Sequence, residues 1–104
     1  MVMDVHGRDL RYFVAVAEEL HFTRAAEKMY VSQPALSKQI RMLERQLGAP
    51  LFHRGPHGVR LTPVGTALLP YARQALAAWD LGWEAAERAK SGQRATLILP
   101  GTPG

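Results

Sequence analysis

One stretch of the sequence carries start and stop signals for a single helix, between Ser32 and Gly48. Ser32 is a good N-cap residue, because its hydroxyl can accept a hydrogen bond from an otherwise unpaired N–H of the first turn. Pro34 falls in the first turn, where its missing N–H costs nothing. Gly48 comes just after the last periodic residue, where a left-handed backbone conformation ends many helices. We therefore predict a helix over residues 32–47.

The two faces of this predicted helix differ in chemistry. Apolar residues recur at the spacing of a stripe that faces a core: Leu36, Ile40, Leu43 and Leu47. Polar and basic residues lie on the other side or at the exposed N-terminus: Gln33, Pro34, Ser37, Lys38, Arg41 and Arg45. Glutamine and serine can pair with base edges in a DNA major groove, and lysine can pair with guanine or phosphate. The alternative is an ordinary solvated basic face.

The distribution of charge favours a polyanionic partner. Residues 32–62 contain five Lys or Arg residues and one acidic residue, so this region accounts for the whole formal net charge of +4. Such a concentrated positive region favours a partner with many negative charges, although charge alone does not identify it. At 104 residues and 47% hydrophobic content, the chain fits one small domain with a core, with or without appendages.

A first helix is predicted over residues 8–19. Its inward stripe consists of Leu10, Phe13, Val14 and Ala17. Tyr12 and Val16 lie to the side of this stripe. They either meet a partner subunit or pack within one chain.

A short second helix is predicted over residues 23–29, with Thr23 near its cap. A short helix, a tight turn and a longer helix with an exposed polar N-terminus form the helix-turn-helix arrangement. In that arrangement the second helix enters the major groove and the first braces against the DNA backbone. Thr23 and Arg24 are placed to hold a phosphate oxygen. We also predict a backbone contact for Arg41.

A hairpin is predicted after Gly48. The runs 51–54 and 59–61 are short and extended, and turn-forming residues separate them. Two strands are not stable alone in water, so this hairpin must pack on the helices. A basic hairpin beside a recognition helix is a wing. Arg54 can reach the minor groove or its phosphates, with Arg60 as a second contact or as a solvated surface charge.

A long helix is predicted over residues 63–90, because Thr62-Pro63 supplies a cap followed by proline at the first helical position. Apolar residues at alternating three- and four-residue steps form a coiled-coil seam: Leu69, Ala72, Leu76, Trp79, Trp83 and Ala86. The tryptophans need a cover, and a second copy of the chain is predicted to supply it. The alternative is a helix that folds back on residues 8–61.

The last residues predict a change of structure. Residues 91–94 read as a linker, and residues 95–101 resemble one buried strand. A single strand is not a domain, so the chain looks cut from something longer. We therefore divide it into a DNA-binding domain (1–62), a dimerisation helix (63–90) and a hinge with the start of a further domain (91–104).

Several function classes are disfavoured. The chain has no cysteine, which excludes disulfides and thiolate metal sites. No apolar run approaches a membrane span, and residues 1–6 lack the core of a signal peptide, so we expect a cytoplasmic protein without membrane contact. His53 and His57 lie across the hairpin turn without a third ligand at a sensible spacing. We expect no metal, no cofactor and no enzymatic activity, and interpret both histidines as wing residues.

Residues 10–73 resemble the N-terminal DNA-binding domain of LysR-type transcriptional regulators. The matching segments, in order, are 10–19, 22–27, 31–40, 43–44, 47–48, 51–54 and 61–65. The resemblance implies a mainly α fold: a winged helix-turn-helix with a two-stranded wing, followed by a long helix that pairs two subunits. It also implies a C-terminal effector-binding domain, beginning near Thr96, that would take any small-molecule effector.

The resemblance also assigns roles to residues. In the family, the residues matching Gln33, Pro34, Ser37 and Lys38 face the major groove. The residue matching Arg54 serves the wing, and those matching Thr23 and Ser32 hold phosphates. Two positions depart from the family: Lys38 stands where arginine is frequent, and His21 stands where a small polar residue is common.

The predicted function is therefore sequence-specific binding of double-stranded DNA by a homodimer in the bacterial nucleoid. Two-fold related half-sites would match the symmetry of the dimer. A tetramer is possible in a longer protein. The competing hypothesis is a coiled-coil interaction module that binds a partner protein and no nucleic acid.

Overall fold

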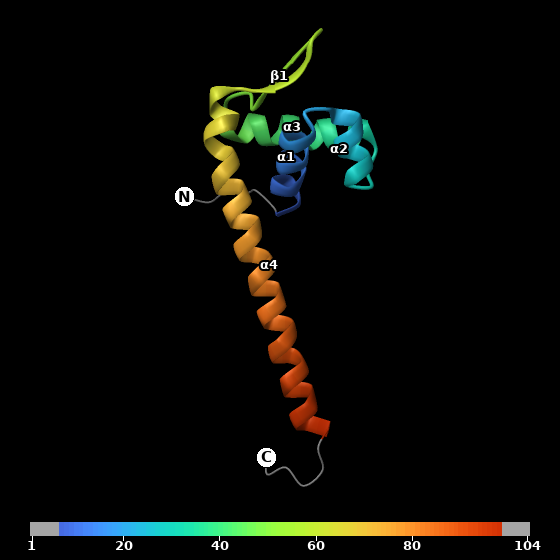
Figure 1. Ribbon diagram of the computed structural model, residues 1–104, viewed down its shortest axis with the longest axis vertical. Coiled ribbons are helices and arrows are strands. Elements are labelled where there is room, and N and C mark those ends of the chain that lie inside the picture. The colour runs from blue at the N-terminus through green and yellow to red at the C-terminus, as the bar shows by residue number, and fades with distance from the viewer. Residues whose placement is uncertain (1–6, 99–104) are drawn as a thin grey trace.

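The computed structural model describes residues 7–98, and the side chains of residues 7–93. The elements in this range are, in order, α1 (Gly7–Glu19), α2 (Phe22–Lys28), α3 (Gln33–Leu47), β1 (Phe52–Gly55), β2 (Gly58–Leu61) and α4 (Pro63–Ile98). The first three helices and the hairpin form a head, from which α4 projects as a long rod (Figure 1).

The core of the head lies where α1, α3 and the base of the hairpin meet. Its largest fully buried side chains are Phe13, Leu36, Ile40, Leu51 and Val16. The hairpin joins this core through Phe52, whose ring lies 5.5 Å from the ring of Phe13 and 5.9 Å from that of Phe22, centroid to centroid. The hairpin therefore packs on the helices, as expected.

The burial of three side chains in α1 and α3 bears on the sequence-based expectations. Tyr12 and Val16 are buried in this head, so packing within one chain is the correct alternative for both. The apolar spacing predicts Leu47 as the last residue of the core stripe, but its side chain is 49% exposed. Helical periodicity predicts which side of a helix faces the core. A residue on that side is buried only where a neighbouring element lies against it.

The second helix begins one residue earlier than predicted. His21 is the N-cap residue of α2, and its Nδ1 accepts a hydrogen bond from the backbone N–H of Arg24 over 3.1 Å. A neutral imidazole can accept in the same way as a hydroxyl. Thr23, which was predicted to lie near this cap, is the second residue of the helix, two positions after His21.

Both predicted ends of the third helix are confirmed. The Oγ of Ser32 accepts from the backbone N–H of Ala35 over 3.2 Å. At the other end, Gly48 adopts a φ of 83°, which side chains disfavour and glycine tolerates, and its N–H donates to the carbonyl of Glu44.

The hairpin is antiparallel, with Phe52 opposite Leu61 and Gly55 opposite Gly58. β1 begins at Phe52, one residue later than expected. The backbone N–H groups of Leu51 and Phe52 both donate to one carboxylate oxygen of Glu44, over 2.7 and 3.4 Å. This carboxylate attaches the start of the wing, which we define as residues 52–61, to α3.

The long helix continues to Ile98, so the predictions of a linker at 91–94 and a strand from 95 are wrong for the described residues. A helix pairs its own backbone groups, whereas an isolated strand would leave them unpaired. Residues 99–101 of the predicted strand lie outside the described residues.

The predicted seam divides into two parts. Its first part packs on the chain's own head: Ala72 is only 2% exposed, and Leu69 packs against the same core. Further along, Trp79 and Trp83 are 61% and 60% exposed. Folding back on residues 8–61 is thus correct for the start of α4, while the tryptophan-bearing part lies on the projecting rod (Figure 1).

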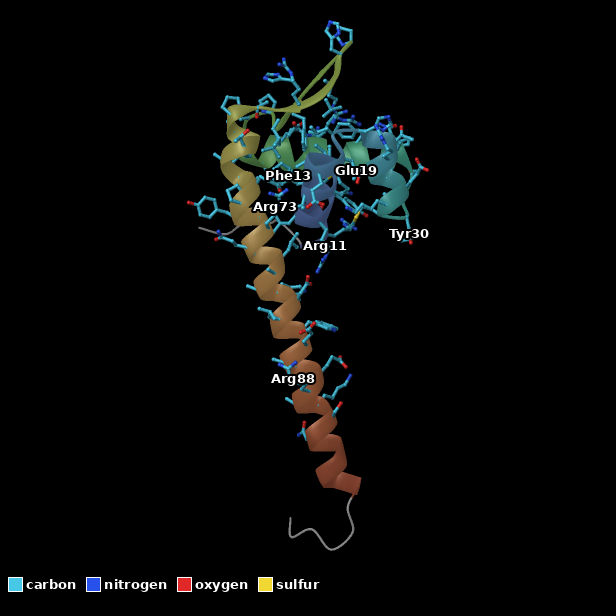
Figure 2. All side chains as sticks on the ribbon, viewed as in Figure 1. Arg11, Phe13, Glu19, Tyr30, Arg73 and Arg88 are labelled. Atoms are coloured by element: carbon cyan, nitrogen blue, oxygen red, sulfur yellow. The ribbon has the colours of Figure 1, made fainter. Side chains whose placement is uncertain are left out.

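Two ion pairs connect α4 to α1. A guanidinium nitrogen of Arg11 lies 2.6 Å from a carboxylate oxygen of Asp80, and Arg73 lies 3.7 Å from Glu18. Figure 2 shows Arg11 and Arg73 on the side of the head where the rod leaves it. These contacts link residues far apart in the sequence, at the exposed edge of the surface where α4 packs on α1.

Candidate nucleic-acid interface

We use the term reading face for the residues of α3 that are predicted to contact DNA, namely Gln33, Pro34, Ser37, Lys38 and Arg41. Most of this face is exposed. Gln33, Pro34, Lys38 and Arg41 are all exposed. Ser37 is not: only 4% of this residue is exposed, which corrects the expected position of its side chain. The reason is geometric, because three residues along a helix correspond to a rotation of about 300°, which leaves Ser37 only about 60° from buried Ile40.

A hydrogen bond joins two of the predicted base-contacting residues. The Nε2 of Gln33 donates to the Oγ of Ser37 over 2.7 Å. The two residues are one helical turn apart, which brings their side chains together. The exposed amide of Gln33 is therefore supported by a buried hydroxyl.

The predicted phosphate-binding residues lie at two helix N-termini. Thr23 and Arg24 are exposed in the first turn of α2, and Ser32 is exposed at the start of α3. The hydroxyl of Ser32 accepts its capping bond and still has its own proton to donate. Partial positive charge at a helix N-terminus favours an anion such as phosphate.

The wing carries its two arginines in different settings. The guanidinium carbon of Arg54 lies 3.9 Å above the centre of the Phe22 ring, which is a cation–π contact. Burial lowers the pKa of the Arg54 guanidinium; Glu44 acts to raise it and Arg41 to lower it. The side chain remains charged at neutral pH. Arg60 is exposed and lies opposite His53 in the hairpin.

Sequence reasoning missed three of these contacts: the His21 cap, the bond from Gln33 to Ser37 and the stacking of Arg54 on Phe22. The spacing of four residues between Gln33 and Ser37 is the one local signal that could have indicated its contact. The contact between Arg54 and Phe22 joins the wing to α2, and no pattern of neighbouring residues in the sequence predicts it.

Within residues 7–93, no group of three or more histidine, cysteine, aspartate or glutamate side chains could hold a metal ion. Among the described residues, no helix combines the length and the apolar character needed to cross a bilayer.

A short helix, a turn, a capped helix with a polar N-terminal face and a two-stranded wing define a winged helix-turn-helix protein. The sequence model of the bacterial regulatory helix-turn-helix proteins of the lysR family matches residues 7–66. The chain belongs to this family.

Curated relatives support the assignment. The chain is 48% identical over 97 residues to the HTH-type transcriptional regulator IlvR of Caulobacter vibrioides, which covers 93% of the chain and 32% of the relative. It is 42% identical over 92 residues to the regulator AlsR of Bacillus subtilis, covering 88% of the chain and 30% of the relative. The chain thus spans about a third of the length of these relatives.

Solved structures are also similar. A crystal structure of the BenM DNA-binding domain with catB site 1 DNA has a TM-score of 0.80 at 44% identity, and the match covers 84% of this chain and 98% of that one. The CbnR DNA-binding domain in complex with DNA has a TM-score of 0.72 at 36% identity, with coverage of 86% and 99%. These similarities give no support to an interaction module without nucleic acid.

Proposed function

We propose that this chain is the DNA-binding part of a bacterial transcription regulator, and that it binds double-stranded DNA sequence-specifically as a homodimer. The observation that carries the proposal is the exposed polar start of α3 beside a basic wing, on a fold similar to domains solved with DNA. Such a protein acts at the chromosome, in the bacterial cytoplasm. Binding requires no cofactor and no catalytic step.

In this proposal the start of α3 enters the major groove. Gln33, Pro34 and Lys38 face the base edges, and Arg41 contacts the backbone. Thr23, Arg24 and Ser32 hold phosphates from two helix N-termini. The wing lies at the minor groove, where Arg54 and Arg60 meet the sugar-phosphate backbone.

A homodimer would place two such heads on one duplex. The exposed tryptophans of α4 supply an apolar surface that a second copy can cover. A two-fold axis between the copies requires two-fold related half-sites in the DNA. An effector-binding domain, and any tetramer, would belong to a longer protein of which this chain is a part.

The test begins with selection of duplexes from a random pool by the purified chain. Affinity for an enriched duplex is then measured by fluorescence anisotropy over a range of salt concentrations. The logarithm of the binding constant should fall linearly with the logarithm of salt concentration, with a slope of about −0.9 for each phosphate contacted. Arg41→Ala should reduce the magnitude of this slope by about 1.

Lys90→Ala is the matched control, because Lys90 is a basic residue on the distal part of α4. It should leave the slope unchanged. Failure to enrich any sequence, or binding that does not respond to salt, would contradict the proposal.

A further inference from the structure

The hydrogen bond inside the reading face has a donor and an acceptor in different environments. Gln33 is exposed at the first position of α3, whereas Ser37 is buried against the head. The Nε2 of Gln33 donates to the Oγ of Ser37 over 2.7 Å. The hydroxyl of Ser37 thus accepts a hydrogen bond from its own helix, and because the residue is buried it offers little surface to a groove.

This bond determines what the Gln33 amide can offer to DNA. A glutamine amide has two N–H donors and one carbonyl acceptor. With one N–H held by Ser37, one N–H and the Oε1 remain. A single donor beside a single acceptor is the complement of the adenine edge in the major groove, where N7 accepts and the N6 amino group donates. The bond also restricts a flexible side chain before DNA arrives, which reduces the entropy lost on binding.

We propose that Ser37 is a positioning residue that orients the Gln33 amide toward adenine, and that it is not itself a base-contacting residue. This inference rests on the proposed function, because it assigns base preference within the same interface. The sequence predicted a separate base contact for each of the two residues. In this inference Gln33 makes the base contact, and Ser37 holds the Gln33 amide in position.

The test is a double-mutant cycle on a duplex enriched by the wild-type chain. Affinity is measured for duplexes in which each base pair of one half-site is changed in turn. The wild type should prefer adenine at one position by about 5- to 150-fold, the range for a bidentate contact. Ser37→Ala should reduce this preference by about 2- to 10-fold, the effect of losing one hydrogen bond. In a Gln33→Ala background, Ser37→Ala should change no base preference.

Further measurements separate positioning from a structural role. Ser37→Thr keeps the hydroxyl and should retain the preference. Ser37→Ala should leave thermal unfolding and the affinity for unrelated DNA close to those of the wild type. Without any DNA, the side-chain amide protons of Gln33 should differ in NMR spectra from those of exposed Gln74, and Ser37→Ala should remove the difference.

Three outcomes would overturn the inference. The first is a change of base preference caused by Ser37→Ala in the Gln33→Ala background, since Ser37 would then read a base itself. The second is an unchanged adenine preference in Ser37→Ala. The third is a wild-type Gln33 amide that matches Gln74. A wild-type chain that enriches no sequence is a different result, because it would overturn the proposed function on which the inference rests.

Discussion

Gly65 lies where the first turn of α4 crosses the chain that leads into the wing. A Cβ atom at this position would overlap the carbonyl oxygen of Leu51 and lie 2.8 Å from a methyl carbon of Leu61. The backbone oxygen cannot move without disturbing its hydrogen bond from the N–H of Thr62. The residue type here is therefore set by a close approach between two segments.

Gly65→Ala should accordingly lower the free energy of unfolding by about 1–3 kcal/mol, the usual cost of overpacking. Gly82→Ala is the matched control in the same helix, because a Cβ atom added at Gly82 would meet nothing within 4 Å. That variant should be neutral or gain up to about 1 kcal/mol from helix propensity. Urea unfolding at a fixed protein concentration measures both, and equal effects would contradict the explanation.

Substitutions of the two wing arginines should both weaken DNA binding, but only one of them should lower the stability of the fold. Arg54 stacks on Phe22, whereas Arg60 is exposed. Arg54→Ala should cost about 0.5–1 kcal/mol of stability through the lost cation–π contact, and should weaken DNA binding as well. Arg60→Ala should weaken DNA binding without a measurable change in stability. Thermal unfolding and anisotropy titrations test this, and equal stability losses would count against the stacking contact.

Glu44 couples two elements, the recognition helix and the wing. Its carboxylate accepts from the backbone N–H groups of Leu51 and Phe52, which would otherwise lack an acceptor at the start of β1. Glu44 is also the one acid among residues 32–62. An acidic side chain in a basic region would weaken DNA binding, so its presence is explained by this attachment.

Glu44→Ala should destabilise the head by about 1–3 kcal/mol, because buried donors lose their partner. Glu44→Gln keeps a carbonyl oxygen as acceptor and should lose less. Hydrogen exchange of the Leu51 and Phe52 amides gives the readout: both should exchange faster in Glu44→Ala than in Glu44→Gln. Identical exchange in the two variants would show that the carboxylate does not hold the wing.

The molecule as a whole is elongated. Its radius of gyration is 18.9 Å, whereas a compact chain of this length would have about 13 Å. The difference comes from α4, whose distal part is exposed along its length (Figure 1). Arg88, on this distal part, lies well away from the head in Figure 2. The rings of Trp79 and Trp83, with centroids 6.3 Å apart, are largely exposed on this helix and form an apolar surface there.

Replacing both tryptophans by glutamate should dissociate the proposed homodimer, since charge in a desolvated interface is costly. Leu81→Glu is the control: Leu81 is also exposed on α4, but lies outside the seam. Light scattering or sedimentation should give the mass of one chain for the double variant and of two for the control. A wild-type chain that is monomeric at all concentrations would contradict the dimer.

Local chemistry in the sequence was sufficient for much of this fold. The cap at Ser32, the stop at Gly48 and the hairpin turn depend on neighbouring residues, and each formed as predicted. The matching segments were also sufficient to identify the family, because their order reflects one arrangement of elements.

The tertiary structure decided which predicted side chains reach the surface. Ser37 is buried and Leu47 exposed, although periodicity indicated the reverse for both. Burial depends on where other elements begin, end and cross, which helical spacing alone does not specify. The same reason explains the division of the α4 seam: α1 covers its start, whereas Trp79 and Trp83 lie at the edge of α1 beside Arg11 and stay largely exposed.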